Sequence, residues 1–462
     1  MKQINKDILK LAIPSILANI TVPLVGMVDI AIAGHLDTNA ATMIGGIAIG
    51  SMLFDLLYWN FGFLRIGTGG LAAQAYGRGD RRECARILTR AFGISLAIAL
   101  VLLAIQWIFV KAAFLVVDCT PEVRSLASQY FFIRIWAAPA TLSLMAFKGW
   151  FIGMQDSVSA MVCDVTVNGV NIVASLLLAL GVTVKGTTLV PSIGFSGIAA
   201  GTVIAQWTGL TVALVLLFVK YRKGTMDRMC REDLKGLFRG SETRRFFVMN
   251  TDLFIRSLCF IAIYIGFTVI SARYGDLLLA VSSILMKLLM IFSYFTDGFA
   301  YAGEALTGRY IGADNRPMVR QTVKWTFVWS MGLALAFMVI YQAAGVPMLR
   351  MMTSDQAVVA AAKDYLPWLL LMPPVGCAAF TWDGIYIGAT ASKGMRNSML
   401  WAVAAFAAVW AAGITVLSMQ NLATDVYDKA AMHILMAAYF AHLLARTIYM
   451  SWKSTRLPAL SR

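Results

Sequence analysis

Residues 139–153 read PATLSLMAFKGWFIG, and residues 374–388 read PVGCAAFTWDGIYIG, with proline and glycine at the same places. The matching continues upstream at one constant offset of about 235 residues. The residues that recur are Gly77, Tyr130, Pro139, Gly149 and Gly153, which correspond to Gly312, Tyr365, Pro374, Gly384 and Gly388. These residues punctuate corresponding apolar segments. The chain therefore contains a duplicated unit, and duplicated hydrophobic units are typical of transporters.

The composition identifies the unit as membrane-embedded. Of the residues, 59% are hydrophobic and 14% are charged, and the mean hydropathy is +0.73. A membrane span needs about 20 mainly apolar residues. We find six such segments in each half: 8–34, 44–76, 86–117, 121–153, 157–182 and 191–220, then 246–272, 277–311, 318–351, 355–388, 396–420 and 430–453. The sequence predicts an all-α polytopic membrane protein with twelve transmembrane helices in two pseudo-symmetric six-helix lobes.

The net charge of +15 could suggest nucleic-acid binding, but the distribution of the charge argues against it. Most of the Lys and Arg residues lie at the termini and in alternate loops, as the positive-inside rule requires for a polytopic protein. Both termini are thus predicted to be cytoplasmic. The protein is expected to span a cell inner membrane. Because each half has six spans, the two copies are expected to have the same orientation in the membrane.

A polar segment midway along the chain sets the predicted domain boundaries. We expect an N-lobe at 1–220, a cytoplasmic linker at 221–245, a C-lobe at 246–453 and a cytoplasmic tail at 454–462. A lipid-headgroup or regulatory role for the basic linker is the alternative to a simple connection.

The sequence contains no enzyme signature. It has no GxSxG, HExxH or P-loop motif, and its six cysteines are scattered without a CxxC pair. The run Gly67-Thr68-Gly69-Gly70 lies inside an apolar segment with no preceding strand, so its small residues are better suited to close helix packing than to a dinucleotide. We therefore predict no catalytic residues and no cofactor.

Asp29 is the acidic residue of the first span. Pro23 should bend this helix, and Gly26 lies one turn before Asp29 on the same face, leaving room beside the carboxylate. A carboxylate in a low-dielectric environment is costly in its charged form and so favours proton uptake. We interpret Asp29 as a coupling-ion residue; a structural Asp bonded to neighbouring helices is the alternative.

Polar residues line one face of the fifth span at i, i+4, i+7 and i+11: Asp164, Asn168, Asn171 and Ser175. Thr202 continues the pattern in the sixth span. Such a stripe suits a hydrated cavity or a cation site, and hydrogen bonding between helices explains it equally well. A possible Na⁺ site near Asp29 and Asn171 is not firmly indicated.

The second half carries a different polar cluster. Asp252 and Arg256 are spaced i, i+4, which favours an ion pair within the seventh span or a shared network. In the eighth span, Asp297, Tyr301 and Glu304 share a face, ten residues and more beyond Lys287. These charged residues could neutralise one another, which is a structural role. They could instead form a second site that binds the substrate or a proton, and the sequence leaves both interpretations open. Asp383, at the position of Lys148 in the first copy, is expected to be structural.

These motifs together resemble the multidrug and toxic compound extrusion (MATE) transporters, over nearly the whole chain. The resemblance rests on Pro14, Pro23, Asp29 and Gly34-His35-Leu36, on Gly194-x2-Gly197-x3-Gly201-Thr202, and on the Gly-x3-Gly pairs. Asn250-x-Asp252-x3-Arg256 with Asp297 to Glu304 is similar to the DNA-damage-inducible-F branch.

The resemblance implies a V of two lobes and a secondary antiporter exporting amphipathic, often cationic compounds against H⁺ or Na⁺ by alternating access. Asp29 matches the coupling residue, and Asn171 matches a family Asn. Many relatives have an Asp four residues after that Asn, whereas this chain has Ser175, which favours H⁺.

A flippase for a lipid-linked precursor is the alternative function, because related flippases share this architecture. It should show a strongly basic cavity to hold pyrophosphate. The expected partners of the chain are a small-molecule substrate and the bilayer, with no nucleic acid, and the chain is expected to be a monomer.

Overall fold

The computed structural model describes residues 2–36, 40–115, 117, 119–184, 187–228, 241–353, 355–420 and 423–455. About half of the predicted linker and most of the predicted tail, at 229–240 and 456–462, therefore lie outside the described residues.

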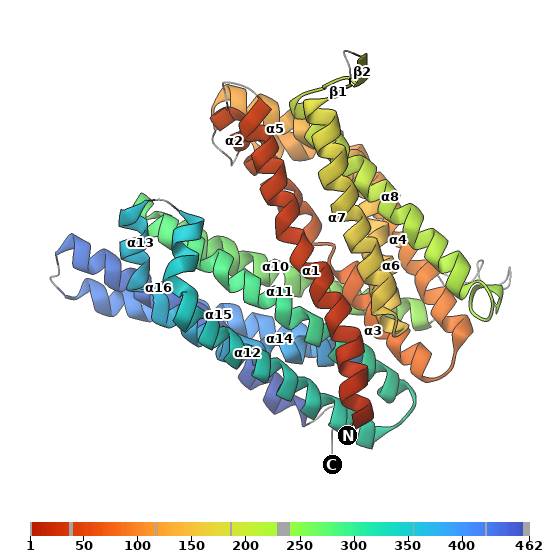
Figure 1. Ribbon diagram of the computed structural model, residues 1–462. Helices are drawn as coiled ribbons and strands as arrows, with labels where there is room; N and C mark the ends of the chain where they lie inside the picture. Colours follow the sequence, from red (N-terminus) through yellow and green to blue (C-terminus); the bar gives the residue numbers. More distant parts are fainter. Residues whose placement is uncertain are drawn as a thin grey trace. The chain divides into compact units, whose positions relative to one another are not determined.

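The described chain is a succession of long helices (Figure 1). Their bounds in the first half are α1 Lys2–Leu36, α2 Ala40–Trp59, α3 Phe63–Gly77, α4 Arg81–Ala113, α5 Pro121–Arg134, a 3₁₀ turn η1 Ile135–Ala137, α6 Ala138–Gly153, α7 Ser157–Leu180 and α8 Phe195–Tyr221. After a second 3₁₀ turn, η2 Met226–Arg228, they are α10 Ser241–Ala272, α11 Asp276–Gly312, α12 Arg316–Met352, α13 Gln356–Lys363, α14 Leu366–Gly388, α15 Ser392–Ser418 and α16 Thr424–Ser454.

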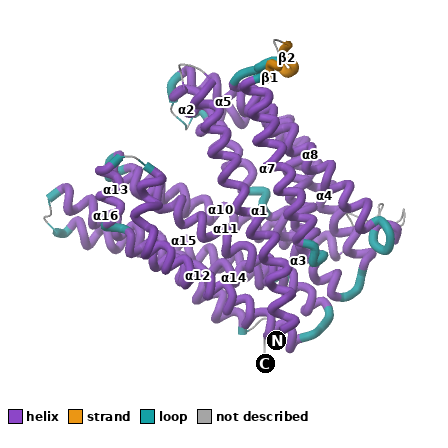
Figure 2. The backbone as a smooth tube through the Cα atoms, viewed as in Figure 1, coloured by secondary structure: helices purple, strands orange, loops and turns teal. Residues whose placement is uncertain are grey.

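One small hairpin accompanies the helices in the described residues, drawn in orange in Figure 2. Its strands are β1 Val182–Val184 and β2 Thr187–Val190, which pair antiparallel between α7 and α8. The fold is therefore all-α in its membrane-embedded part, as predicted.

Within the described residues, eleven helical segments are long and apolar enough to cross a membrane. They correspond to eleven of the twelve predicted spans, with α2 and α3, and likewise α5 and α6, joined into single segments. The remaining prediction, 355–388, is occupied by α13 and α14. Pro373, Pro374 and Asp383 lie within α14.

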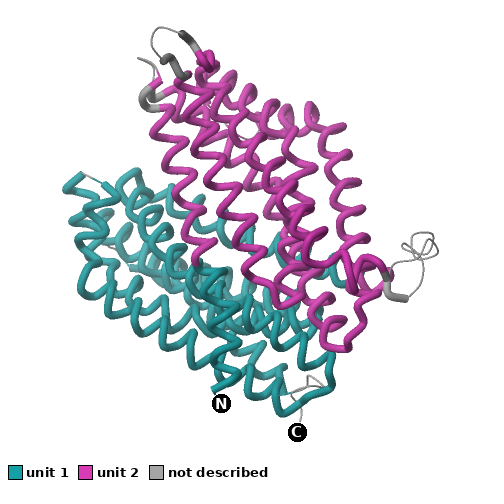
Figure 3. Tube along the Cα trace, turned by 45° about the vertical axis from the view of Figure 1, so that its right-hand side comes forward, with its two compact units in different colours: residues 1–16, 247–462 teal, residues 17–246 magenta. Residues whose placement is uncertain are grey.

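The chain forms two compact units, coloured separately in Figure 3. One contains residues 17–246, and the other contains residues 1–16 with residues 247–462. This differs from the predicted N-lobe at its start, because the first sixteen residues pack with the C-terminal unit. In that unit Asn5 accepts a hydrogen bond from the indole of Trp329 on α12 (3.0 Å), and Ile16 lies against Gly298 on α11.

The repeated glycines mark close helix contacts in each unit. A Cβ on Gly149 of α6 would collide with the carbonyl oxygen of Arg65 on α3, and one on Gly384 of α14 would collide with that of Ala300 on α11. Gly153 and Gly388 meet the carbonyls of Gly69 and Glu304 in the same way. Each partner pair is related by the sequence offset, so the duplicated glycines exist because two helices meet backbone to backbone.

The turns repeat at the same offset. The side chain of Asp80 caps α4 by accepting from the Glu83 amide (2.9 Å), and that of Asn315 caps α12 by accepting from the Met318 amide (3.2 Å). Positive φ angles also recur, at Gly79 and Asp314 (73° and 50°) and at Gln155 and Thr390 (65° and 53°). The duplication therefore extends to the local backbone conformation.

Candidate functional site

Asp29 lies in the membrane-spanning part of α1 and is buried, with 6% of its surface exposed. Its Oδ1 atom has no hydrogen-bond partner. Nothing lies within 4 Å of a Cβ placed on Gly26, so α1 has open space one turn before the carboxylate. A buried carboxylate with an unsatisfied oxygen is costly when charged and has an oxygen available for a proton.

Arg134, at the end of α5, is the basic residue whose charge acts on this carboxylate. It interacts electrostatically with Asp29 and with Asp55 of α2. The guanidinium donates to the Tyr130 hydroxyl (2.9 Å) and lies 4.7 Å from the centre of the Phe54 ring. These contacts hold the guanidinium against Tyr130 and Phe54. The sequence analysis did not include Arg134 in the site.

The polar face of α7 is used for contacts between helices. Asn168 donates to the Thr21 hydroxyl of α1, and Asn171 donates to the Thr202 hydroxyl of α8 (2.9 Å). Ser175 is fully buried and donates to the carbonyl of Ile198 on α8 (3.3 Å). The Oδ1 atom of Asn171 has no hydrogen-bond partner. No contact between Asp29 and either asparagine is recorded among these described residues.

Asp164, the first member of that stripe, has a different environment. It forms an ion pair with Lys148 on α6. The pair is one-fifth to one-quarter exposed, and it neutralises the carboxylate that the stripe offered to a cation. The stripe therefore has one uncompensated carboxylate fewer than its sequence indicates.

In the C-terminal unit the predicted Asp252–Arg256 pair is not formed. Asp252 accepts from the Ser392 hydroxyl and from Arg396, both at 2.7 Å, at the start of α15. Arg256 turns instead to Asp383 on α14 (2.6 Å). The i, i+4 spacing allows an intrahelical pair, but each of the two residues pairs with a residue on another helix, on α15 and on α14.

Asp383 is the centre of a three-residue ion cluster. Its Oδ2 atom accepts from Arg256 (2.6 Å) and from Arg446 of α16 (2.5 Å). Arg446 is 1% exposed. Two guanidiniums thus share one carboxylate. Asp383 was expected to be structural, and Arg446 was not predicted at all.

The side chains of the predicted α11 cluster differ in how deeply they are buried. Glu304 is fully buried, Asp297 and Tyr301 are half-buried, and Lys287 is exposed. Ten helical residues separate Lys287 from Asp297, a rise of about 15 Å, so direct neutralisation of one by the other is excluded. The shared face lies against other helices of its unit, since Gly298 meets α1 and the Glu304 carbonyl meets Gly388 of α14.

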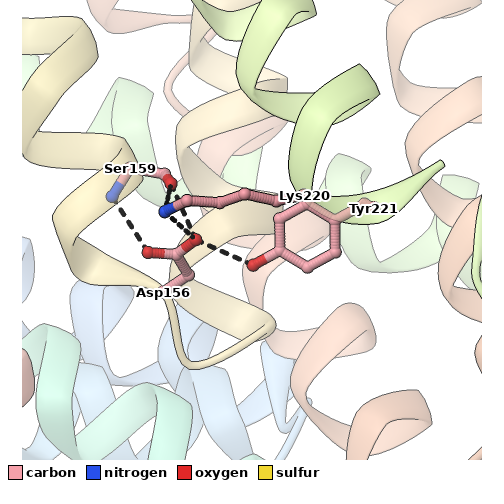
Figure 4. Close-up of polar contacts among 4 residues, drawn as sticks. All are labelled: Asp156, Ser159, Lys220 and Tyr221. Atoms are coloured by element: carbon pink, nitrogen blue, oxygen red, sulfur yellow. Dashed lines mark hydrogen bonds and ion pairs between the residues drawn. The ribbon is translucent and has the colours of Figure 1, made fainter. Parts of the chain in front are cut away.

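A second network is centred on Asp156, which lies in the short connection between the spans that end in α6 and begin with α7 (Figure 4). Asp156 caps α7 through the Ser159 amide (3.0 Å) and also accepts from Lys220 (3.1 Å) and Tyr221 (2.8 Å) at the end of α8. Burial alone would raise the pKa of the Asp156 carboxyl, but the hydrogen bonds from Ser159, Tyr221 and Lys220 lower it below its usual value. This network ties α7 to α8.

The missed residues share a weak sequence signal. Arg134 and Arg446 are single arginines inside apolar runs, and intramembrane arginines indicate a partner or a cavity. Their partners lie on other helices, so one-dimensional spacing could not identify them. In the described residues no group of three or more His, Cys, Asp and Glu side chains is arranged to hold a metal ion.

Comparison with known proteins gives consistent relatives. The family model described as MatE matches residues 14–177 and 253–399. The chain is 34% identical over 405 residues to DNA damage-inducible protein F of Escherichia coli K12, covering 87% of this chain and 84% of that protein. It is 21% identical over 420 residues to the probable multidrug resistance protein NorM of Thermotoga maritima, covering 90% and 85%.

Solved structures agree on the fold. A multidrug resistance MATE family transporter of the MOP superfamily, in an outward-facing conformation, superposes with a TM-score of 0.81 at 15% identity, covering 99% of this chain and 97% of that one. A MOP superfamily transporter from Pyrococcus furiosus, described as having a binding pocket of reverse polarity, superposes with a TM-score of 0.77 at 16% identity, covering 99% and 97%. The chain therefore belongs to the MATE family, whose members are membrane transporters and not enzymes.

Proposed function

We propose that the chain is a secondary active antiporter that exports amphipathic organic compounds in exchange for protons. The observation that carries the proposal is the Asp29 carboxylate, which is buried within a membrane span and has an oxygen without a hydrogen-bond partner. Burial makes the charged form of this carboxylate costly, and Arg134 interacts with it electrostatically. A carboxylate between these influences is suited to exchange a proton as its access to water changes.

The exchange needs one bound proton per cycle at Asp29. The proton neutralises the carboxylate from one side of the membrane and leaves to the other side, and export of the substrate is coupled to this movement. One charge moving through 100 mV supplies about 2.3 kcal/mol. Protons are favoured over Na⁺ because Ser175 supplies no carboxylate and Asp164 is paired with Lys148, which leaves few anionic ligands for a cation.

We further propose that the chain lies in a cell inner membrane with both termini cytoplasmic and acts as a monomer. The bias of Lys and Arg toward alternate loops supports this orientation. Fusions of reporter proteins to each terminus would test it, and an external reporter signal at either end would contradict it.

The flippase alternative receives less support. A pyrophosphate group needs several cations available in one cavity. Lys148 is paired with Asp164, and Arg256 and Arg446 share Asp383, so one net positive charge remains among these three embedded cations, fewer than a pyrophosphate group needs.

Transport in proteoliposomes tests the proposal. The purified protein is exposed to an imposed pH gradient or Na⁺ gradient with a panel of cationic and anionic dyes. We expect export driven by the pH gradient, and Asp29→Asn should abolish it while the variant remains folded. Asp7→Asn is the matched control. Asp7 is on the same helix, near its N-terminal end, and its side chain accepts a hydrogen bond from Gln3 in an exposed position. Export driven by Na⁺ alone would contradict proton coupling.

A further inference from the structure

A pocket inside the C-terminal unit lies apart from Asp29 and from the α7 stripe. It is enclosed by α10, α11, α14 and α16. Two of its lining residues are ionisable side chains of α16, His442 and Arg446, and each is 1% exposed. The pocket therefore has a deeply buried polar end.

That end carries a surplus of positive charge. Arg446 and Arg256 donate to the same oxygen of Asp383, so two guanidiniums are balanced by one carboxylate. In the part of the chain that the structure describes, no second carboxylate forms an ion pair with either arginine. One net positive charge thus lies buried beside the pocket, and burying an uncompensated charge is costly.

The same end has unsatisfied hydrogen-bonding atoms. The Nε atom of Arg446 and the Nδ1 atom of His442 have no hydrogen-bond partner, and neither do the Nε atom of Arg256 and the Oδ1 atom of Asp383 in the same cluster. The His442 ring packs against Tyr439, with centroids 4.5 Å apart, which holds it at the pocket wall. Buried polar atoms normally have partners, so these atoms indicate a ligand that the chain itself does not supply.

Most of the remaining pocket wall is apolar, with Ser293 and Tyr439 as its hydroxyl-bearing residues. Aromatic, aliphatic and thioether side chains surround the polar end: Phe260, Leu289, Met290, Met372 and Phe380. Methionine side chains are flexible, so the two on this wall can rearrange to admit a ligand larger than the space seen here. A site with one charged end and an apolar body matches an amphipathic ligand.

We propose that this pocket binds amphipathic carboxylates, with the carboxylate at Arg446 and His442 and the apolar body against the aromatic and methionine wall. The anion would neutralise the surplus charge and accept from the free guanidinium edge. This differs from the cationic substrates that the family resemblance implies. Treating the ligand as exported cargo rests on the proposed transport function; the binding itself does not.

Binding of 4-phenylbutyrate to the purified, detergent-solubilised protein tests the proposal. A scintillation proximity assay with tritiated 4-phenylbutyrate should give saturable binding. The neutral 4-phenylbutanamide, of nearly the same shape, should compete at least about 10-fold less well, because it lacks the charge. Inorganic phosphate has charge without an apolar body and should not displace the ligand at equal concentration. No saturable binding, or equal competition by the amide or by phosphate, would overturn the proposal.

Variants of the pocket locate the binding. Arg446→Met removes the surplus charge and leaves Asp383 paired with Arg256, so no buried charge loses its partner. It should weaken binding about 10-fold to 100-fold. Leu289→Trp fills the apolar end and should weaken binding while keeping the charge. Arg350→Met, an exposed arginine of α12 in the same unit, is the matched control. Unchanged affinity in both folded pocket variants would place the ligand elsewhere and refute the site.

The two proposals can fail separately. Asp29→Asn should bind 4-phenylbutyrate with the wild-type affinity, because Asp29 belongs to the other unit. Normal binding without proton-driven export would reject the antiport mechanism alone. Proton-driven export of other compounds without carboxylate binding would reject this pocket alone.

Discussion

Gly149 in the first half and Gly384 in the second both meet the carbonyl oxygen of a neighbouring helix, and one residue earlier the first half has Lys148 where the second has Asp383. Lys148 pairs with α7 of its own half. Asp383 has the opposite charge and binds arginines on α10 and α16. The glycine contacts are therefore equivalent in the two halves, and the ion pairs beside them are not.

This difference separates scaffold from chemistry. A backbone-to-backbone contact admits no side chain, so it persists in both copies of a duplicated unit. A charged side chain needs only some partner of opposite sign, so its partners can change as the copies diverge. The N-terminal unit accordingly has the buried carboxylate of Asp29 on α1, and the C-terminal unit has a surplus arginine beside Asp383.

The largest expected effect separates the two ion pairs. Asp383→Asn leaves two buried guanidiniums without their shared carboxylate and should lower the free energy of unfolding by about 3–5 kcal/mol. Lys148→Met, at the equivalent position, leaves a partly exposed Asp164 and should cost about 1 kcal/mol. Denaturant unfolding in detergent measures both. Equal losses would show that the two clusters are energetically alike.

The glycine contacts should behave alike in both halves. Gly149→Ala and Gly384→Ala each force a methyl group against a carbonyl oxygen and should each cost about 1–3 kcal/mol. Gly169→Ala and Gly332→Ala are the controls, because a Cβ at either site meets nothing within 4 Å. The controls should be neutral or stabilising by up to about 1 kcal/mol. A harmless Gly149→Ala or Gly384→Ala would refute the close contact.

A smaller effect concerns a contact that only the first half has. Asp156 caps α7, whereas Ala391 occupies the equivalent position before α15 and makes no side-chain cap. Asp156→Asn should lower the free energy of unfolding at pH 7 by about 1–2 kcal/mol, through the lost charged hydrogen bonds.

The pH dependence of that effect follows from the lowered pKa of Asp156. A carboxyl whose pKa is lower in the folded state stabilises the fold above its unfolded pKa and loses this contribution as the pH falls through the folded value. The difference between wild type and Asp156→Asn should therefore shrink on acidification below about pH 4. A difference that stays constant down to pH 2 would show that the charge of Asp156 is not involved.

Much of the fold could be predicted from the sequence, because hydrophobic runs and repeated glycines are local or periodic features. The all-α membrane architecture and eleven of the predicted spans are present. The grouping of residues 1–16 with the C-terminal unit was missed, since nothing within that segment specifies which unit it packs against.

The site was less predictable for a physical reason. Asp29 can be identified from the sequence as the acidic residue of its span. Arg134, Arg396 and Arg446 cannot be assigned to a site from the sequence alone, because their partners lie on other helices. The pairing of Asp252 with Arg256 was wrong because spacing along one helix states which contacts are possible and not which partner is better. Thr202 and Asn171 were both predicted to belong to the site. They lie beside each other because α7 packs on α8.

The central claim is that the Asp29 carboxylate carries the coupling proton. Proteoliposomes loaded with the pH-sensitive dye pyranine measure this directly, when a gradient of a transported compound is imposed without a pH gradient. The wild-type protein should change the internal pH as the compound moves. Asp29→Asn should leave the internal pH unchanged while Asp7→Asn behaves as wild type. Proton movement at the wild-type rate in Asp29→Asn would contradict the account.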